Sequence, residues 1–285
     1  MSAPDHASAW IASHLPSAEL LLTSRQDPSD CAGPWLVDWA CGHGRHSLLA
    51  LDRGWRVLAL DRDEEALRSL ERRAQAAGGA SALQTVSEDL EAVHPAGFWR
   101  QRLRDIACAT AARSQAGWGI HKPGGDTRAS NHQGIHKRGN HSGGIGASGI
   151  GASGIDAPGV GASGIRAPGI DTWGIDALVI TRYLHRATWT TLASLLAPGG
   201  WFLHETFAQG HARYGRPTRD AFLLRPGELL ALAQQAHLAI LAFEDGTLLD
   251  AQGKGCARVQ RLVARRPFPD GRADCWAGFA LRGAH

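Results

Sequence analysis

Short apolar runs alternate with amphipathic segments over two stretches of the chain, 34–104 and 174–265. The runs have the length of strands, and the segments between them repeat apolar residues at helical spacing. Strands that alternate with helices pair in parallel and carry helices on both faces. The pattern therefore predicts an α/β fold with a doubly wound, mainly parallel sheet. The predicted strands are Trp35–Asp38, Arg56–Leu60, Ala82–Val86, Ala177–Thr181, Trp201–His204, Leu238–Phe243 and Ala257–Val263.

Helices are expected between these strands. Glycine pairs and Pro-Gly steps mark several of their ends. Residues 1–33 resemble a short amphipathic lead-in helix that Pro16 interrupts. The other predicted helices are one from near His43 to just before Gly54, Glu64–Ala76, one with the apolar stripe Trp189, Leu192, Leu195 and Leu196, and Leu229–Gln235.

Residues 105–173 differ in composition from the rest of the chain. They hold 16 of the 35 glycines, and their second half repeats five residues, beginning with Gly144-Ile-Gly-Ala-Ser. One apolar residue in five does not offset the entropy lost on ordering so much glycine. We therefore predict a disordered, low-complexity, glycine-rich insertion here, and a separate tail at 266–285.

The charge and cysteine content limit the kinds of site and the cellular location that are expected. The net charge of +3 is mild, and the five cysteines include no C-x-x-C pair. This argues against a disulfide framework and against a zinc site, so no metal is predicted. We expect no secretory leader, because the first thirty residues lack a basic start followed by an apolar run, and no run approaches the roughly 20 apolar residues of a membrane helix. We expect a cytoplasmic protein without a membrane partner.

The candidate chemistry begins where the first predicted strand ends. The segment Val37–His46 reads as a strand, a glycine turn with Gly42 and Gly44, and a helix start. Glycine allows positive φ and close approach of a ligand, and a helix start offers unpaired N–H groups. Asp61 ends the second strand, 19 residues after Gly42, and is placed to bind ribose hydroxyls. Asp89, after the third strand, is placed to bind an adenine amine.

Two features argue against a dinucleotide as the ligand. The turn is Gly42-x-Gly44-x-x-Ser47, so the third glycine of the dinucleotide fingerprint is missing. Asp38 lies beside the turn, where its charge would repel a pyrophosphate but suit an ammonium group.

The block Asp38-x-Ala40-x-Gly42-x-Gly44 resembles the first motif of class I S-adenosylmethionine-dependent methyltransferases, in which glycine usually stands at the Ala40 position. Within that class, the blocks Tyr183–Arg186, His204–Phe207 and Leu224–Leu229 are similar to bacterial tellurite-resistance-type enzymes. The resemblance implies a Rossmann-like sheet of seven strands, the last antiparallel, and S-adenosylmethionine as the cofactor. The cofactor-binding residues that it implies are Asp38, Ala40, Cys41, Gly42, Gly44, Asp61, Arg62, Asp89, Leu90 and Thr181.

Candidates for a catalytic base are Tyr183, His185, His204 and Glu205, which follow the fourth and fifth strands. For each of them a structural role is the alternative. His185 would cap or pack a helix, and Glu205 would pair with Arg182 or Arg213. Thr181, Arg182 and Tyr183 are expected to face the transferred methyl group.

The sequence thus predicts methyl transfer from S-adenosylmethionine to a small molecule. The alternatives are a non-catalytic module that binds the cofactor and a nicotinamide-dependent oxidoreductase. The sequence lacks the interleaved aromatic and basic residues that are typical of nucleic-acid-binding surfaces, so a nucleic-acid partner is not predicted. The methyl acceptor and the oligomeric state are left open.

Overall fold

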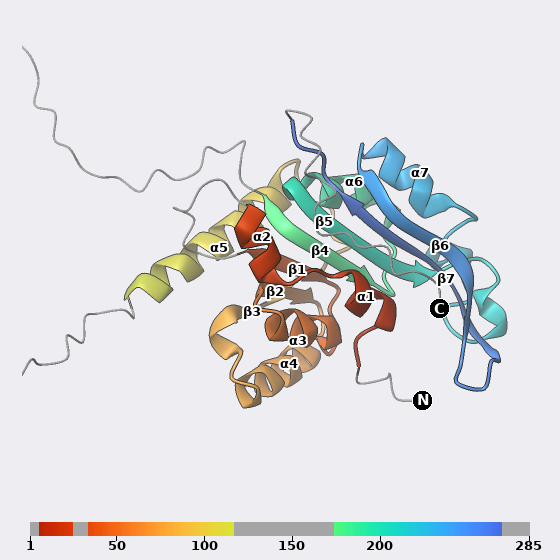
Figure 1. The fold of residues 1–285 in the computed structure, drawn as a ribbon, viewed down its shortest axis with the longest axis horizontal. Coiled ribbons are helices and arrows are strands. Elements are labelled where there is room, and N and C mark those ends of the chain that lie inside the picture. The colour runs from red at the N-terminus through yellow and green to blue at the C-terminus, as the bar shows by residue number, and fades with distance from the viewer. Residues whose placement is uncertain (1–5, 25–33, 117–173, 270–285) are drawn as a thin grey trace, which may run out of the picture.

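The computed structural model describes residues 6–24, 34–116 and 174–269. Seven strands form one sheet in the order β3-β2-β1-β4-β5-β7-β6 (Figure 1). Only β7 runs antiparallel to its neighbours β5 and β6. The predicted seven-stranded, mainly parallel sheet is therefore confirmed. The strands are β1 (Trp35–Trp39), β2 (Arg56–Asp61), β3 (Leu83–Ser87), β4 (Ile175–Thr181), β5 (Leu196–Phe207), β6 (Ala239–Leu249) and β7 (Gly255–Arg265).

Helices cover both faces of this sheet and bury two separate apolar clusters. One cluster joins the sheet to α1, α2, α3 and α4, and the other joins it to α5, α6 and α7. The strands bury residues on both faces, as β1 and β4 do along their whole length, because each face carries its own helix layer. The helices are α1 (Ala9–His14), α2 (Ala18–Ser24), α3 (Arg45–Asp52), α4 (Glu64–Ala76), α5 (Phe98–Ala116), α6 (Arg186–Ser194) and α7 (Glu228–Gln235), with short 3-10 turns at Ala80–Ala82, His211–Arg213 and Asp220–Phe222.

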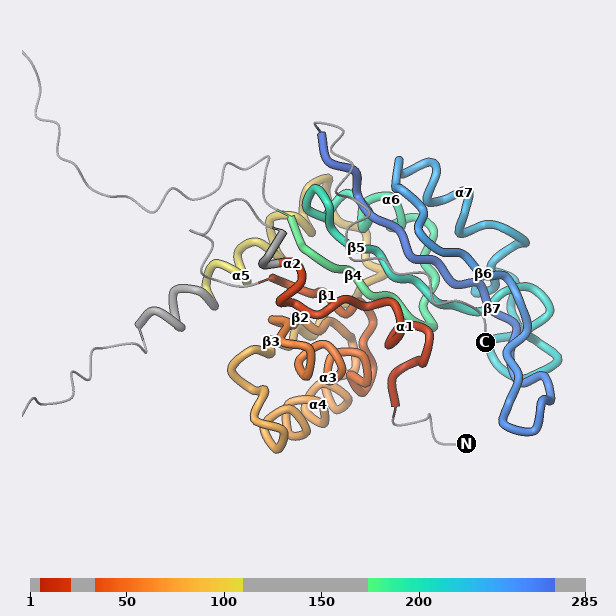
Figure 2. The backbone as a smooth tube through the Cα atoms, viewed as in Figure 1, coloured from red at the N-terminus to blue at the C-terminus, as the bar shows by residue number. Residues whose placement is uncertain are grey.

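The order of the strands places β1 and β4 side by side in the middle of the sheet, although a long stretch of chain separates them in sequence (Figure 2). From β1 the chain winds outwards through β2 to β3, and from β4 it winds the other way through β5. This change of direction is the topological switch point of doubly wound folds, where ligands bind beyond the carboxyl ends of the strands.

The start of the predicted insertion is corrected by α5. We placed the boundary at residue 105, but the helix runs from Phe98 to Ala116. Trp99, Leu103 and Ala107 are buried against the sheet, which gives the helix an apolar stripe at 3.6-residue spacing. The sequence beyond 104 is rich in alanine, which favours helix strongly. The rest of the predicted insertion, 117–173, lies outside the described residues, as does most of the predicted tail.

The β5 and β6–β7 region also differs from the sequence-based bounds. Leu195 and Leu196 were assigned to the helix, but α6 ends at Ser194 and Leu196 already pairs with Ile175 of β4. The strands β6 and β7 extend well past their apolar cores as a paired hairpin, which continues through an irregularity at Leu248–Leu249 to the pair Leu249 and Gly255. Backbone pairing continues there into polar sequence, so hydrophobic patterning alone underestimates the strand lengths.

Candidate functional site

The turn after β1 brings together the residues on which the candidate site depends. Ala40, Gly42 and Gly44 all have positive φ, of 59°, 54° and 70°. A Cβ on Gly44 would meet Leu70 of α4 at 2.4 Å, whereas a Cβ on Gly42 would meet nothing within 4 Å. Gly44 is therefore needed for packing between α3 and α4. Gly42 leaves open space at the sheet edge where a ligand can approach the backbone.

Asp61, at the end of β2, is tied directly to this turn. One carboxylate oxygen accepts the N–H of Gly42 at 2.7 Å, and the other accepts the N–H of Asp63 at 3.0 Å. A carboxylate has about four lone-pair positions. Asp61 is only partly buried and lines the pocket, so it retains acceptor capacity towards a ligand.

A pocket with a volume of about 890 Å³ opens at the carboxyl ends of β1, β2 and β4. This size is near the upper end of the roughly 300–1,000 Å³ of small-molecule sites, which leaves room for a cofactor and an acceptor together. Of the ten predicted cofactor-binding residues, eight line this pocket: Ala40, Cys41, Gly42, Asp61, Arg62, Asp89, Leu90 and Thr181. Gly44 is not among the lining residues; it packs against Leu70 of α4.

Asp38 lies behind the pocket rather than in its wall. Its side chain is completely buried, and one oxygen accepts the Ser47 hydroxyl at 2.6 Å. Burial raises its pKa to about 6. The other oxygen has no hydrogen-bond partner among the described residues. Contact between Asp38 and a ligand amine through a water molecule therefore stays a prediction.

The far end of the pocket carries Asp89, Leu90 and Tyr183. Asp89 is exposed, and one of its oxygens accepts the Glu91 N–H at 3.1 Å, so the carboxylate is held at the start of a turn. The Tyr183 hydroxyl donates to the carbonyl of Leu90 at 3.3 Å, which links β4 to the segment after β3. Burial, followed by the nearby charge of Glu91, raises the pKa of Tyr183 to about 12. Its hydroxyl is protonated at neutral pH and is no general base.

Thr181 connects the pocket to the N-terminal segment through His46. The Nδ1 atom of His46 lies 3.2 Å from the Thr181 hydroxyl, and its Nε2 accepts the N–H of Ser8 at 3.1 Å. Because Nε2 accepts, Nδ1 carries the proton and donates to Thr181. Burial lowers the pKa of His46 to about 3, with the charge of Arg45 as the next cause. His46 is therefore a neutral positioning residue. The sequence analysis did not select it.

The predicted roles of Glu205 and His185 are revised. Neither residue lines the pocket. Glu205 is buried; it accepts a hydrogen bond from the Ser8 hydroxyl at 2.7 Å and forms an ion pair with Arg261 at 2.9 Å. The expected pairing with Arg182 or Arg213 is wrong, because Arg261 of the neighbouring strand β7 reaches the carboxylate instead. His185 is the N-cap residue of α6, and its ring lies 3.1 Å from the Thr188 hydroxyl.

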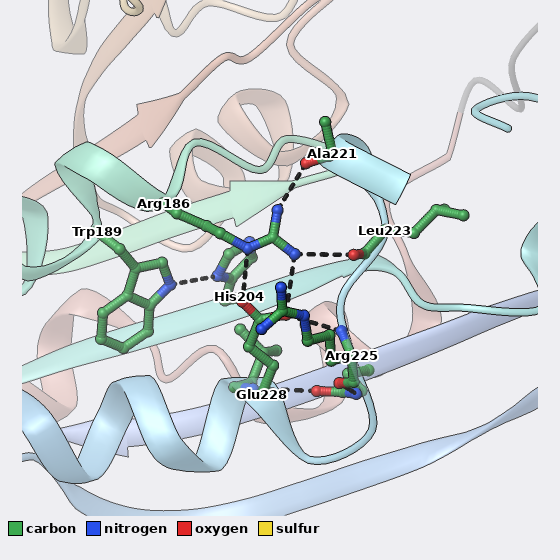
Figure 3. Close-up of polar contacts among 9 residues, drawn as sticks. Arg186, Trp189, His204, Ala221, Leu223, Arg225 and Glu228 are labelled. Carbon is green, nitrogen blue, oxygen red and sulfur yellow. Dashed lines mark hydrogen bonds and ion pairs between the residues drawn. The ribbon is translucent and has the colours of Figure 1, made fainter. Parts of the chain in front are cut away.

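His204 belongs to a buried structural network on the face of the sheet that α6 and α7 cover (Figure 3). Its Nδ1 accepts the Trp189 indole N–H at 3.1 Å, and its Nε2 lies 3.0 Å from the carbonyl of Tyr183. Burial lowers its pKa to about 4, so the ring is neutral. His204 packs the core and does not reach the pocket.

The same view shows how two of the three sequence blocks that suggested a narrower family, Tyr183–Arg186 and Leu224–Leu229, contact one another. Arg186 makes a two-pronged ion pair with Glu228, at 2.6 and 2.9 Å, and also donates to the carbonyls of Ala221 and Leu223 (Figure 3). Glu228 in turn accepts the N–H of Arg225 at 2.7 Å. The blocks thus fix the starts of α6 and α7 to the loop before α7. Their role in this structure is architectural.

Several lining residues were not selected from the sequence. Ser69 and Arg73 of α4 stand four residues apart, so one helix face turns both towards the pocket. The sequence could have indicated them, because α4 begins just after Asp61 and its residues at four-residue spacing share one face. Arg45 follows Gly44 directly and lies at the start of α3. The lining residues that the sequence analysis did not select are His43, Arg45, Ser69, Arg73 and Glu91. Arg182 and Tyr183, which were expected to face the methyl group, also line the pocket.

Within the ranges that the structure describes, no group of three or more His, Cys, Asp or Glu side chains is arranged to hold a metal ion. No helix in these ranges has both the length and the apolar character needed to cross a membrane. Cys41 lines the pocket, but burial raises the pKa of its thiol far above the usual range, so it is no nucleophile at neutral pH.

Comparison with known proteins gives structural likeness only. No family model and no curated protein matches the chain. TehB from Haemophilus influenzae has a TM-score of 0.44 and 14% identity over 87% of this chain, which spans 61% of that protein. A methyltransferase from Methanosarcina mazei, described as SAM-dependent, has a TM-score of 0.46 and 12% identity, covering 92% of this chain and 99% of the other. An S-adenosylmethionine-dependent methyltransferase from Mesorhizobium loti has a TM-score of 0.43 and 16% identity, covering 81% and 90%. At such low identity, function has to be argued from the residues of the site.

Proposed function

We propose that the protein is a methyltransferase that uses S-adenosylmethionine and acts on a small molecule. One observation carries the proposal: the glycine turn, Asp61, and the pair Asp89 and Leu90 meet around a single pocket at the switch point. Asp61 offers carboxylate oxygens to a ribose, and Asp89 with Leu90 offers an acceptor and an apolar wall to an adenine. Gly42 gives the remainder of a nucleoside ligand access to the backbone.

The local charge favours this cofactor over a nicotinamide dinucleotide. In a dinucleotide site, the turn and the helix start leave N–H groups open to a pyrophosphate. Here the Gly42 N–H already donates to the Asp61 carboxylate, and Asp38 lies buried just below the turn. Both acids place negative charge where a pyrophosphate would sit, whereas a ligand with an ammonium group is favoured by the same charge.

When bound, S-adenosylmethionine supplies an electrophilic methyl group, so the demanding chemistry resides in the cofactor. The residues at the end of β4 position the acceptor. Tyr183 holds the wall opposite β1 through its bond to Leu90, and Thr181 is fixed by His46. Such positioning can supply about 7–11 kcal/mol of the barrier reduction. Because Tyr183 is protonated and Glu205 is engaged by Arg261, neither of these two candidates serves as a general base.

The test is turnover with labelled cofactor. The full chain is incubated with methyl-labelled S-adenosylmethionine and a library of small acceptors, and products are identified by mass. The proposal expects one or more products that gain the labelled methyl group, with S-adenosylhomocysteine formed in equal amount. Asp61→Ala serves as the matched inactive control. Label transfer that is the same in wild type and in Asp61→Ala would exclude this pocket as the site of the reaction.

A further inference from the structure

The charges around the pocket are divided between its two sides. The lining acids Asp61, Asp89 and Glu91 all follow β2 or β3. Two lining arginines, Arg62 and Arg73, stand on the same side, so that side carries both signs of charge. On the opposite side, where β4 ends, the charged lining residues are Arg45 and Arg182, and no acid lines the pocket there. The proposed nucleoside contacts occupy the acidic side, so the basic side faces whatever else enters the pocket.

The two arginines are the chain neighbours of His46 and Thr181, whose side chains lie 3.2 Å apart, and both line the pocket. Arg45 is half-buried, and its pKa is lowered, first by burial and next by the charge of Arg182. Arg182 is exposed, and neither guanidinium makes a hydrogen bond or an ion pair with any residue in the described part of the chain. Arg182 also has a φ of 55°, in the left-handed region, which costs free energy for a residue with a side chain. Strain of this kind collects at functional sites.

Acids near the two guanidiniums are engaged elsewhere. The carboxylate of Glu205 is bound by Arg261 and by the Ser8 hydroxyl, and that of Asp38 is bound by Ser47. The charges of both acids act on the pKa of Arg45, but neither carboxylate forms an ion pair with it. A pair of guanidiniums without an acidic partner, one of them half-buried, is stabilised when an anion binds between them, because arginine matches carboxylate and phosphate in two-pronged geometry.

We propose that Arg45 and Arg182 form an anion site that holds a carboxylate or phosphate group of the methyl acceptor. The anionic group is an anchor, distinct from the atom that receives the methyl group, and its binding orients that atom at the end of β4. This inference rests on the proposed function, because it assigns the acidic side of the pocket to the cofactor. It makes Arg45 and Arg182 the residues that determine substrate specificity.

The experiment separates cofactor binding from anion binding. Wild type, Arg45→Gln, Arg182→Gln and the control Arg68→Gln are first titrated with S-adenosylhomocysteine and with 5′-methylthioadenosine, which lacks the amino-acid carboxylate. Arg68 is exposed on α4 and pairs with Glu64 outside the pocket. Each protein, saturated with S-adenosylhomocysteine, is then titrated with millimolar benzoate, inorganic phosphate and neutral benzamide.

The proposal expects benzoate or phosphate to bind wild type and Arg68→Gln while benzamide does not. Loss of one guanidinium should weaken that binding about tenfold or more, with little change in the affinity for either nucleoside. Preference for benzoate assigns a carboxylate acceptor, and preference for phosphate assigns a phosphorylated one.

Three results would overturn the inference. The first is binding of neither anion to wild type, and the second is equal anion binding in the two pocket variants. The third is a loss of S-adenosylhomocysteine affinity in these variants with unchanged 5′-methylthioadenosine affinity, which would assign the arginines to the cofactor's own carboxylate. Failure of the proposed function is seen separately, as absence of S-adenosylhomocysteine binding to wild type. The anion titrations are then made on ligand-free protein and judged by the same first two criteria.

Discussion

The carboxylate of Asp61 accepts the backbone N–H of Gly42 at 2.7 Å, so the residue that ends β2 fixes the turn that ends β1. The same side chain also accepts the N–H of Asp63, the N-cap of α4. Asp61 therefore holds two backbone segments of the pocket while it faces the space between them. The pocket is organised before a ligand arrives, which lowers the entropic cost of binding.

Replacement of Asp61 tests both of its roles. Asp61→Ala removes the proposed ribose contacts and the bond to Gly42, and should weaken S-adenosylhomocysteine binding by about 2–4 kcal/mol. Asp61→Asn keeps one acceptor oxygen and should lose less. Calorimetric titration measures the affinity, with Glu64→Ala, an exposed change on α4, as the control. An unchanged dissociation constant in Asp61→Ala would remove this residue from the binding site.

Ala40 occupies a left-handed backbone position with a φ of 59°. A residue with a Cβ pays roughly 1–2 kcal/mol for this conformation, and glycine does not. Ala40→Gly should therefore raise the free energy of unfolding by about 1 kcal/mol, after allowance for the greater freedom of glycine in the unfolded chain. Urea denaturation measures the change. A loss of stability would show that the alanine methyl group contributes packing that outweighs the strain.

The neutral His46 makes stability depend on pH. Its folded-state pKa is about 3 against a usual 6.5, so below pH 6.5 the unfolded chain binds a proton that the folded protein excludes. Stability should therefore fall on acidification, by about 1.4 kcal/mol per pH unit from this residue. Asp38 has the opposite effect on stability, because its folded-state pKa is raised to about 6. Between about pH 4 and 6 the folded protein holds a proton on Asp38 that the unfolded chain releases, so this residue adds stability on acidification.

A variant isolates the contribution of His46. The difference in unfolding free energy between wild type and His46→Gln should change with the predicted slope between pH 6 and 4, because Asp38 acts in both proteins. The imidazole resonances of His46 should not titrate over this range. A parallel pH dependence of the two proteins, or titration of the ring near pH 6, would contradict the assignment of a buried neutral histidine.

The position of α5 changes how the glycine-rich segment should be removed. Replacement of 117–173 by a flexible linker should leave folding and S-adenosylhomocysteine affinity nearly intact, because the sheet, the pocket and the buried side of α5 lie outside this range. A variant that lacks 106–172 should be less stable, because this deletion also removes buried Ala107 and the second half of α5. Thermal unfolding compares the two. Loss of folding in the shorter deletion would show that the glycine-rich segment is structural.

The sequence predicted those parts of the molecule that follow from local pattern. The apolar runs located all seven strands, and α4 was predicted with its observed bounds because Asp63 caps its start and Gly78 follows its end. Gly42, Asp61 and Asp89 were placed in one site because parallel strands bring their carboxyl ends to one edge. Each of these inferences needs only the neighbouring residues and the order of the strands.

Contacts between distant segments were not predictable in this way. Glu205 pairs with Arg261 and Ser8, which are far away in sequence, and no local pattern announces such partners. Asp38 was expected to contact the ligand, but its side chain points from β1 towards Ser47 of α3, whose hydroxyl it accepts. The positive φ at Ala40 and Arg182 depends on turn geometry that the alanine and arginine side chains do not signal.

The central claim is that this pocket binds S-adenosylmethionine, and calorimetric titration of the purified full chain with S-adenosylhomocysteine tests it most directly, with NADH as the parallel ligand. We predict micromolar binding of S-adenosylhomocysteine at one site per chain, weakened in Asp61→Ala, and no binding of NADH. Binding of NADH alone would assign the turn to a dinucleotide and contradict the account, and binding of neither ligand would show that the fold has lost or exchanged this function.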